Sequence, residues 1–297
     1  MRRGLAVLAF GACVPALGST DAVVSRPRIL AVRADPAEAK PGASVKVTVL
    51  VAGPSGTVTA PGIAWSFCTA PKPLTEDNVV SSACLDGSSS IPAGFGSTIT
   101  AATPTNGCSL FGPVAPPGGA RPRDPDVTGG YYQPLRADLA ASDPTFALLR
   151  ITCDLANAPA ASAAAFADAY RPNENPKLLP VAAAIDGTPV SLASIPAGAR
   201  VQLTESWPAE SAQTYASYDA ASDTIVRKRE SLSLSWYSTA GTLDTEATGR
   251  AGDDPATSSD NRWMAPATAG TAYLWIVLRD SRGGIDFASY EITVGGS

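Results

Sequence analysis

The carboxylates around Trp207 are the first residues whose type and spacing could do chemistry. Glu205 and Glu210 flank Trp207 and Pro208, and glycosidases use two carboxylates that converge across a bound sugar. Nothing in this spacing indicates that the two side chains converge, and glutamate is common in loops. The sequence therefore favours coincidence over a catalytic pair, and a hydrolase that uses Asp and Glu is kept as an alternative.

A second acidic group lies in the polar stretch of residues 249–261 and consists of Asp253, Asp254 and Asp260. Calcium prefers oxygen ligands, and carboxylates supply them in many loop sites. The spacing of these three aspartates matches no ion-binding loop. We therefore expect a solvated acidic loop without a metal ion.

Histidine does not occur in this chain. Its absence excludes triads built on histidine, the common zinc-hydrolase sites and histidine general bases. It leaves open chemistry that uses carboxylates alone or a serine with a lysine. Because the sequence contains no catalytic constellation, we expect a protein that is not an enzyme and that needs no cofactor.

Aromatic and basic side chains occupy the insertion between residues 210 and 230. Trp207, Tyr215 and Tyr218 could line a patch that stacks on sugars, or they could pack this insertion onto its own domain. Packing is favoured, because apolar residues surround the two tyrosines in sequence. The basic run at residues 227–229 is expected to be a solvated hairpin edge that discourages aggregation.

The net charge of the chain is −5. Nucleic-acid binding depends on basic side chains that neutralise phosphates. An acidic protein lacks that driving force, so we expect no nucleic-acid partner.

The N-terminus has the order of a secretory signal. Arg2 and Arg3 precede an apolar stretch at residues 4–12, and Cys13 comes directly after it. The stretch is far shorter than the ~20 residues that span a membrane as a helix. We expect residues 1–12 to be a signal peptide; the alternative is ordinary cleavage after Ala16 or Gly18.

The residues Phe10-Gly11-Ala12-Cys13 resemble the lipobox of bacterial lipoproteins, with Phe10 where leucine is usual. That resemblance implies that Cys13 is diacylated and becomes the new N-terminus, which anchors the protein to a membrane. Val14 stands where aspartate would retain a lipoprotein at the inner membrane, so the resemblance implies the outer membrane. Residues 13–27 are expected to form a flexible tether.

Short strands are expected from residue 28 onward, because the chain carries 26 glycines and 26 prolines, which argue against long helices. Valines at positions 45, 47, 49 and 51 alternate with other residues, which is typical of a strand with one buried face. Leu232, Leu234 and Trp236 show the same period. The run at residues 273–278 is continuously apolar and predicts a central strand that is covered on both faces. Asp280 to Gly284 supply hairpin chemistry.

The two halves of the chain echo each other. The residues around Trp65 match those around Trp236, and residues 146–154 match residues 272–280, in the same order. A tryptophan on a middle strand and a long strand near the end are typical of immunoglobulin-like sandwiches. The second half resembles bacterial Ig-like or PKD-type domains, and residues 28–294 resemble lipoproteins of Gram-negative soil bacteria.

We therefore predict an all-β protein with two Ig-like β-sandwich domains in tandem. The first is expected at residues 28–157 and the second at residues 177–297. Between them, residues 158–176 are expected to hold one short Ala-rich helix, with Phe166 and Tyr170 on one face, and a linker. Glu174 and Asn175 lie between two prolines and are expected to fix the turn between the domains.

With Cys13 set aside, an even set of cysteines remains, which suits disulfides in an exported chain. We favour Cys68 with Cys84 and Cys108 with Cys153. The echo places Cys153 at the end of a strand that runs antiparallel to the Trp65 strand, and so away from Cys68. The alternative pairs Cys84 with Cys153 and Cys68 with Cys108. A four-thiolate metal site is disfavoured, because no CxxC pair occurs.

These patterns together predict a cell-envelope lipoprotein that is anchored in the outer membrane through its lipid and serves as a non-catalytic structural or binding module. Its expected partner is an envelope protein or a polysaccharide. Two alternatives remain. One is a carbohydrate-binding or carbohydrate-active surface protein. The other is an accessory subunit of an envelope complex, which predicts a sizeable exposed apolar patch.

Overall fold

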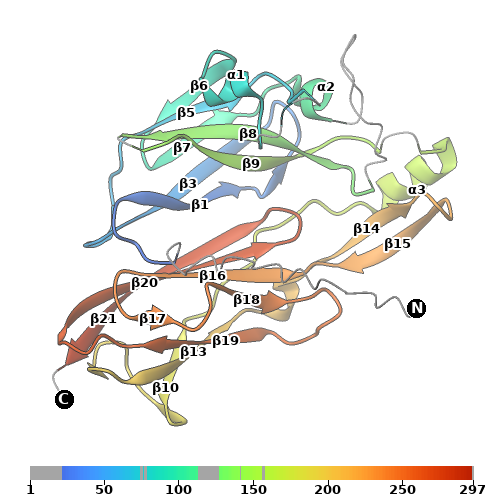
Figure 1. Ribbon diagram of the computed structural model, residues 1–297. Coiled ribbons are helices and arrows are strands. Elements are labelled where there is room, and N and C mark those ends of the chain that lie inside the picture. Colours follow the sequence, from blue (N-terminus) through green and yellow to red (C-terminus); the bar gives the residue numbers. More distant parts are fainter. Residues whose placement is uncertain are drawn as a thin grey trace, which may run out of the picture.

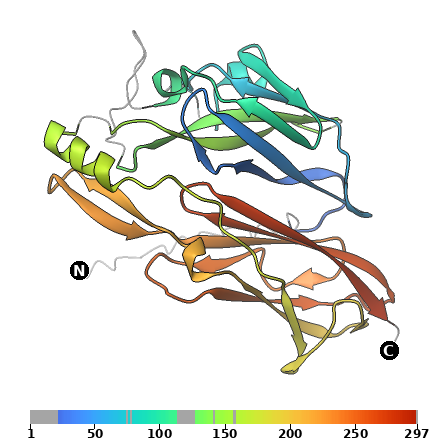
Figure 2. The same cartoon turned by 180° about the vertical axis from the view of Figure 1, so that it is seen from behind.

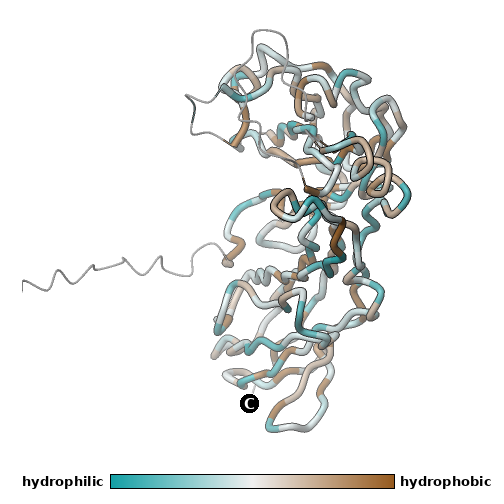
Figure 3. Tube along the Cα trace, turned by 90° about the vertical axis from the view of Figure 1, so that its right-hand side faces the viewer, coloured by the Kyte–Doolittle hydropathy of each residue, from teal (hydrophilic) through white to brown (hydrophobic). Residues whose placement is uncertain are grey.

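The protein is described by a computed structural model that covers residues 22–73, 76, 79–112, 127–140, 142–155 and 158–295. Two β-sandwiches lie one above the other, the first at the top of Figure 1 and the second below it. The view from the side shows the same two lobes stacked along the length of the molecule (Figure 3). The predicted signal peptide and Cys13 lie outside the described residues.

The first sandwich is built from residues 28–152. Its two sheets are antiparallel apart from one short parallel pairing, that of β2 with β9. One sheet has the order β1 (Arg28–Asp35), β3 (Ser44–Gly53), β4 (Gly56–Thr57), and β7 (Thr98–Ala102) also pairs with β3. The other sheet has the order β2 (Glu38–Ala39), β9 (Thr145–Thr152), β8 (Gly130–Leu139), β5 (Ile63–Cys68), β6 (Ser90–Phe95).

The second sandwich repeats this topology. One sheet has the order β11 (Thr188–Pro189), β10 (Ala182–Ile185), β13 (Arg200–Ser206), β19 (Ser258–Met264), β17 (Thr242–Leu243). The other has the order β12 (Ile195–Pro196), β21 (Ile285–Gly295), β20 (Gly270–Asp280), β16 (Leu232–Ser238), β18 (Ala247–Arg250). In both sandwiches the first strand pairs with the next long strand, β1 with β3 and β10 with β13. The last two long strands form one sheet with the tryptophan strand. This is the immunoglobulin-like strand order, so the predicted all-β class is confirmed.

The echo between the halves is correct for the tryptophan strands and wrong for the late strands. Trp65 on β5 and Trp236 on β16 occupy equivalent strands, and both are buried. Strand β20 corresponds to β8, which also pairs with the tryptophan strand. Strand β9, which the echo matched to β20, corresponds to β21. The apolar pattern of β9 misled the comparison because β8 contains the polar residues Gln133, Arg136 and Asp138.

The alternating patterns define the cores. Val45, Val47, Val49 and Val51 on β3 are all buried in the first sandwich. On β20, Leu274, Ile276 and Leu278 fill the core of the second sandwich. Trp275 and Val277 on the opposite face of β20 are equally buried, against the first sandwich. The prediction of a strand covered on both faces at residues 273–278 is therefore confirmed.

Helices are short and lie at the margins of the sandwiches. They are α1 (Ser82–Leu85), α2 (Gly107–Phe111), α3 (Ala160–Ala169) and the 3-10 turn η1 (Ala209–Ser211). Helix α3 is the predicted Ala-rich helix, and Phe166 is buried with its ring centroid 5.4 Å from that of Tyr170. Figure 2 shows α3 against a hairpin of β14 (Thr214–Asp219) and β15 (Thr224–Arg229) that leaves the second sandwich. Among the described residues, no helix is long and apolar enough to cross a membrane.

The four described cysteines are joined in the pairing that the sequence favours. Cys68 bonds Cys84, and Cys108 bonds Cys153. The geometric argument for that choice is wrong, however, because β8 lies between β5 and β9, so that β9 runs parallel to β5. The two disulfides hold a long stretch onto the first sandwich. That stretch contains β6 and β7.

The end of the expected tether is held in place rather than free. Ala22 and Val24 are buried, at 4% and 1% exposed. Val24 N–H donates to Ser238 O at 2.8 Å, and Ser238 N–H donates to Ala22 O at 2.9 Å. The chain therefore contacts the second sandwich before it enters the first.

Candidate functional site

The structure separates the two carboxylates that could have formed a catalytic pair. Glu205 on β13 points into the core of the second sandwich and is fully buried, whereas Glu210 lies exposed on η1. Burial raises the pKa of Glu205 to about 8. A hydrogen bond from Ser206 N–H lowers the pKa, but its effect is smaller than that of burial. A carboxyl group enclosed in a core has no access to a sugar, so this geometry does not support a glycosidase.

Two of the three aspartates of the 249–261 stretch are engaged with their neighbours, and Asp253 is exposed. Asp254 forms an ion pair with Arg250 at 3.2 Å, and Asp260 accepts a hydrogen bond from Thr204 at 2.6 Å. Within the part of the chain that the structure describes, no group of three or more potential ligands is placed to hold a metal ion.

Trp207 and the tyrosines of the insertion are packed against their neighbours rather than exposed as a platform. Trp207 and Tyr218 are buried, at 2% and 5% exposed. The guanidinium of Arg282 lies 4.7 Å from the ring centroid of Tyr215. Tyr218 N–H also donates to Val127 O at 2.7 Å, so the hairpin reaches the first sandwich as well as its own. Of the basic run, Arg227 and Lys228 are exposed on β15.

An apolar layer joins the two sandwiches. Leu30, Leu50 and Ala52 from the outer face of the β1–β3 sheet meet Trp275 and Val277 from the outer face of β20. All of them are buried, and Trp275 also donates from its indole N–H to Thr57 at 2.8 Å. Sheet faces that would be solvated in a single sandwich are thus covered in the pair.

Glu38 is the centre of a buried polar network at the edge of this layer. It has no exposed side-chain surface and forms an ion pair with Arg150 at 3.0 Å. Its carboxylate also accepts hydrogen bonds from Thr152, from Tyr170 and from the backbone N–H of Asn173. A buried carboxylate is stable when its lone pairs are satisfied in this way. Glu38 therefore ties the linker to the first sandwich.

Asp280 and Arg282, in the β20–β21 hairpin, tie the same linker to the second sandwich. Asn173 donates through Nδ2 to Asp280 at 3.2 Å. Arg282 pairs with Glu230 at 2.6 Å and donates to Arg171 O at 2.9 Å. Residues 171–173 are therefore bonded to both sandwiches through buried charged groups.

Asn175 has the structural role that the sequence predicts. Its amide nitrogen donates to Ala34 O in the first sandwich at 2.7 Å, and its amide oxygen accepts from Ile285 N–H in the second at 2.9 Å. The ion pair of Arg33 with Asp286, at 2.7 Å, adds a direct bond between the sandwiches. The sandwiches are fixed by directional bonds as well as by apolar contact.

Sequence reasoning missed the buried polar network around Glu38 and Arg150. The available signal was Arg150, a lone charge inside the apolar strand of residues 146–151, because a charge at such a position is buried and must be paired. The partner, Glu38, could not be identified, because it comes only a few residues after β1 in a segment that has the composition of a turn.

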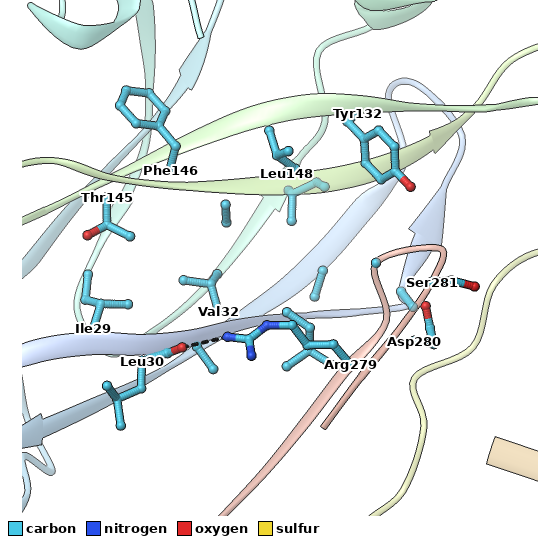
Figure 4. Close-up of a pocket in the computed structure, with 17 residues that line it drawn as sticks. Ile29, Leu30, Val32, Tyr132, Thr145, Phe146, Leu148, Arg279, Asp280 and Ser281 are labelled. Atoms are coloured by element: carbon cyan, nitrogen blue, oxygen red, sulfur yellow. Dashed lines mark hydrogen bonds between the residues drawn. The ribbon is translucent and has the colours of Figure 1, made fainter. Parts of the chain in front are cut away.

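A groove of about 470 Å³ lies where the two sandwiches meet (Figure 4). One wall is β1 with Ile29 and Val32, and the other is β9 with Phe146 and Leu148. Arg279, Asp280 and Ser281 of the second sandwich close it from below and at one end. A second, smaller hollow of about 140 Å³ shares Ile29 and Thr145 with the groove and extends it toward Arg26 and Asp143.

The two walls of the groove are both edges of sheets, and they differ in how their backbones are covered. Arg279 donates to Leu30 O at 2.9 Å, and Asn175 donates to Ala34 O, so that side chains cover the open edge of β1. Strand β9 is covered by β2 only at Arg150 and Ile151. Among the described residues, no further strand pairs with the open edge of residues 145–149.

No family profile matches the sequence, and no curated protein matches it either. Solved structures to which it is similar include the D00–D0 domain of intimin, at 10% identity and a TM-score of 0.24, over 91% of this chain and 98% of that one. The adhesin InvE of Yersinia pseudotuberculosis is 11% identical with a TM-score of 0.23, over 94% of this chain and 62% of that one. Fibronectin(III)-like modules of Clostridium thermocellum CbhA are 12% identical with a TM-score of 0.25, over 90% of this chain and 95% of that one. At these values the likeness does not bear on function.

Proposed function

We propose that this protein is a non-catalytic module of the bacterial cell envelope, in which two Ig-like sandwiches act as one rigid body in a structural or binding role. The observation that supports the rigid body is the shared interface, where an apolar layer around Trp275 lies beside the buried network of Glu38 and Asn173. Domains within a chain are expected to move relative to each other unless their interface is large and hydrophobic.

The location at the envelope is supported by features of the sequence. Arg2 and Arg3 before an apolar stretch and Cys13 have the order of a lipoprotein signal. The two disulfides suit an oxidising compartment outside the cytoplasm. We propose that Cys13 carries the lipid and that the module is held at the outer membrane.

Calorimetry tests the rigid body. The wild-type protein should unfold in one transition whose calorimetric and van't Hoff enthalpies agree, because the sandwiches are coupled. Trp275→Ala removes the largest side chain of the interface and should split that transition or broaden it. Leu234→Ala, inside the second core, is the matched control and should lower the transition temperature without splitting it. Two separate transitions in the wild type would overturn the proposal.

Cell fractionation tests the anchor. In a Gram-negative host, Cys13→Ser should move the protein from the membrane fraction to the soluble periplasmic fraction, with Cys68→Ser/Cys84→Ser as a control that keeps Cys13. If the Cys13→Ser variant matures normally and stays in the membrane fraction, the lipid anchor is refuted. Globomycin, which blocks the lipoprotein signal peptidase, should make only the wild-type precursor accumulate.

A further inference from the structure

We propose that the groove between β1 and β9 binds an extended peptide of a partner protein, which adds as a strand to the open edge of β9 and places an acidic side chain beside Arg26. The proposal rests on the binding role suggested above and names the class of its ligand. Its grounds are the backbone of β9, the covering of β1 and the charges at the mouth of the groove.

The open edge of β9 lacks the features by which proteins protect exposed strand edges. Such edges usually carry charges, prolines or bulges, which prevent pairing with other chains. Residues 145–149 are Thr, Phe, Ala, Leu and Leu, and their pairing with β8 has no register shift. Leu148 is 43% exposed. An unprotected apolar edge is the surface that recognition by strand addition uses.

The peptide should pair with β9 rather than with β1, because backbone groups of β1 are already bonded. The carbonyl oxygens of Leu30 and Ala34 are already bonded to Arg279 and Asn175. An incoming strand would have to displace both side chains to pair with β1, whereas it can pair with β9 without displacing a described group. Residues 145–149 offer about 16 Å of edge, at roughly 3.3 Å for each residue, so about five residues of the peptide would pair.

The same edge already accepts a strand further along. Glu38 and Ala39 of β2 pair with Arg150 and Ile151, directly after the open stretch. A bound peptide would therefore extend an existing line of strand pairing and would lie against the interface of the two sandwiches. Side chains that point inward would meet Ile29, Val32 and Ile285, which line the groove. This wall favours apolar residues at alternate positions of the peptide.

Charge complementarity sets the remaining requirement. The exposed Arg26 lines the hollow that continues the groove, and Asp143 lines it as well. At the other end, the Asp280 carboxylate is bonded to Asn173 and to the backbone N–H groups of Arg282 and Gly284. Over the groove and this hollow together, the lining holds three arginines and two aspartates, in a chain whose net charge is −5. An acidic residue of the peptide would be attracted to this lining.

A display library of random heptapeptides, selected on the full chain, tests the proposal. Enriched peptides should alternate apolar residues and carry an acidic residue near one end. Their amides and those of residues 145–149 should gain protection in hydrogen exchange when they bind. The absence of enrichment, or protection elsewhere than on β9, would overturn the proposal.

Matched variants locate the site. Leu148→Lys puts a charge on the edge and should weaken binding of a selected peptide by about tenfold or more. Leu179→Lys, at a residue that is also 43% exposed, should leave binding unchanged. Arg26→Glu should weaken binding of acidic peptides, and Arg227→Glu on β15 should not. Equal effects of Leu148→Lys and Leu179→Lys would refute the groove.

Sedimentation separates a peptide from a second copy of this chain. If the wild type dimerises with rising concentration and Leu148→Lys abolishes the dimer, the edge pairs with itself and the peptide proposal is wrong. A single unfolding transition together with no peptide binding would reject the groove and leave the rigid module intact. Two unfolding transitions together with peptide binding would reject the rigid body and leave the groove intact.

Discussion

Replacing Glu205 by glutamine should stabilise the protein at neutral and alkaline pH. The Glu205 side chain has no exposed surface, and Oε2 has no hydrogen-bond partner among the described residues. Burial, and to a smaller extent the nearby Asp286 carboxylate, favours the protonated form by raising the pKa. Glutamine has the same shape without the titrating proton, and its amide oxygen can accept the hydrogen bond from Ser206 N–H that Glu205 accepts now.

The size of the effect is set by the two pKa values of Glu205. The pKa is 4.5 in the unfolded chain and about 8 in the folded protein. Below pH 4.5 both states hold the proton and Glu205 costs nothing. Between the two values the unfolded chain releases its proton while the folded protein keeps it, so stability falls as pH rises. At about 1.4 kcal/mol for each pH unit, the loss is on the order of 3 kcal/mol at pH 7 and levels off at about 4 to 5 above pH 8.

Urea unfolding at several pH values measures this loss. The difference in unfolding free energy between Glu205→Gln and the wild type should be near zero at pH 4.5 and grow until about pH 8. Taking the difference removes the contributions of other titrating groups. Glu210→Gln, at the exposed neighbour on η1, is the control and should match the wild type at every pH. A difference that does not change with pH would refute the reasoning.

Two further perturbations are expected to destabilise the first sandwich. Glu38→Gln leaves the buried Arg150 charge without its carboxylate and should lower the unfolding free energy in urea by about 3 to 5 kcal/mol; Arg200→Gln, which breaks an exposed pair, should change it by less than about 1 kcal/mol. Replacing Cys108 and Cys153 together by serine opens a bond with a sequence separation of 45, which should cost about 4 kcal/mol in the chain-entropy description; an unchanged urea midpoint would contradict the bond's role.

The class of fold could be predicted because its signals are local. Val45 to Val51 and Leu232 to Trp236 alternate with period two, and the structure buries the apolar residues at these alternate positions. Residues 273–278 show a continuous apolar run because both faces of β20 are covered, one by its own core and one by the other sandwich. The sequence thus predicted that the second face is covered, but it could not show by what.

The strand order of the first sandwich was not predicted, because β8 has a weak pattern. On β8, Leu135 and Ala137 point into the core and alternate with Arg136 and Asp138. These two charged side chains form an ion pair at 2.8 Å. Gln133 is also fully buried and donates to Cys68 O at 2.8 Å. Polar residues that are satisfied by specific partners cannot be told from loop residues in one sequence. The partners of Glu38, among them Arg150 and Tyr170, could not be predicted for the same reason.

The groove exists only because the two sandwiches are joined. Its β1 and β9 walls belong to the first sandwich, whereas Arg279, Ser281 and Gly283 belong to the hairpin of the second. An apolar layer alone would let the sheet faces slide, since dispersion and burial have no preferred direction. Asn175, with one hydrogen bond to each sandwich, removes that freedom at the end of β1. A variant that loosens the linker should therefore weaken peptide binding without touching the peptide, which makes the joint part of the binding site.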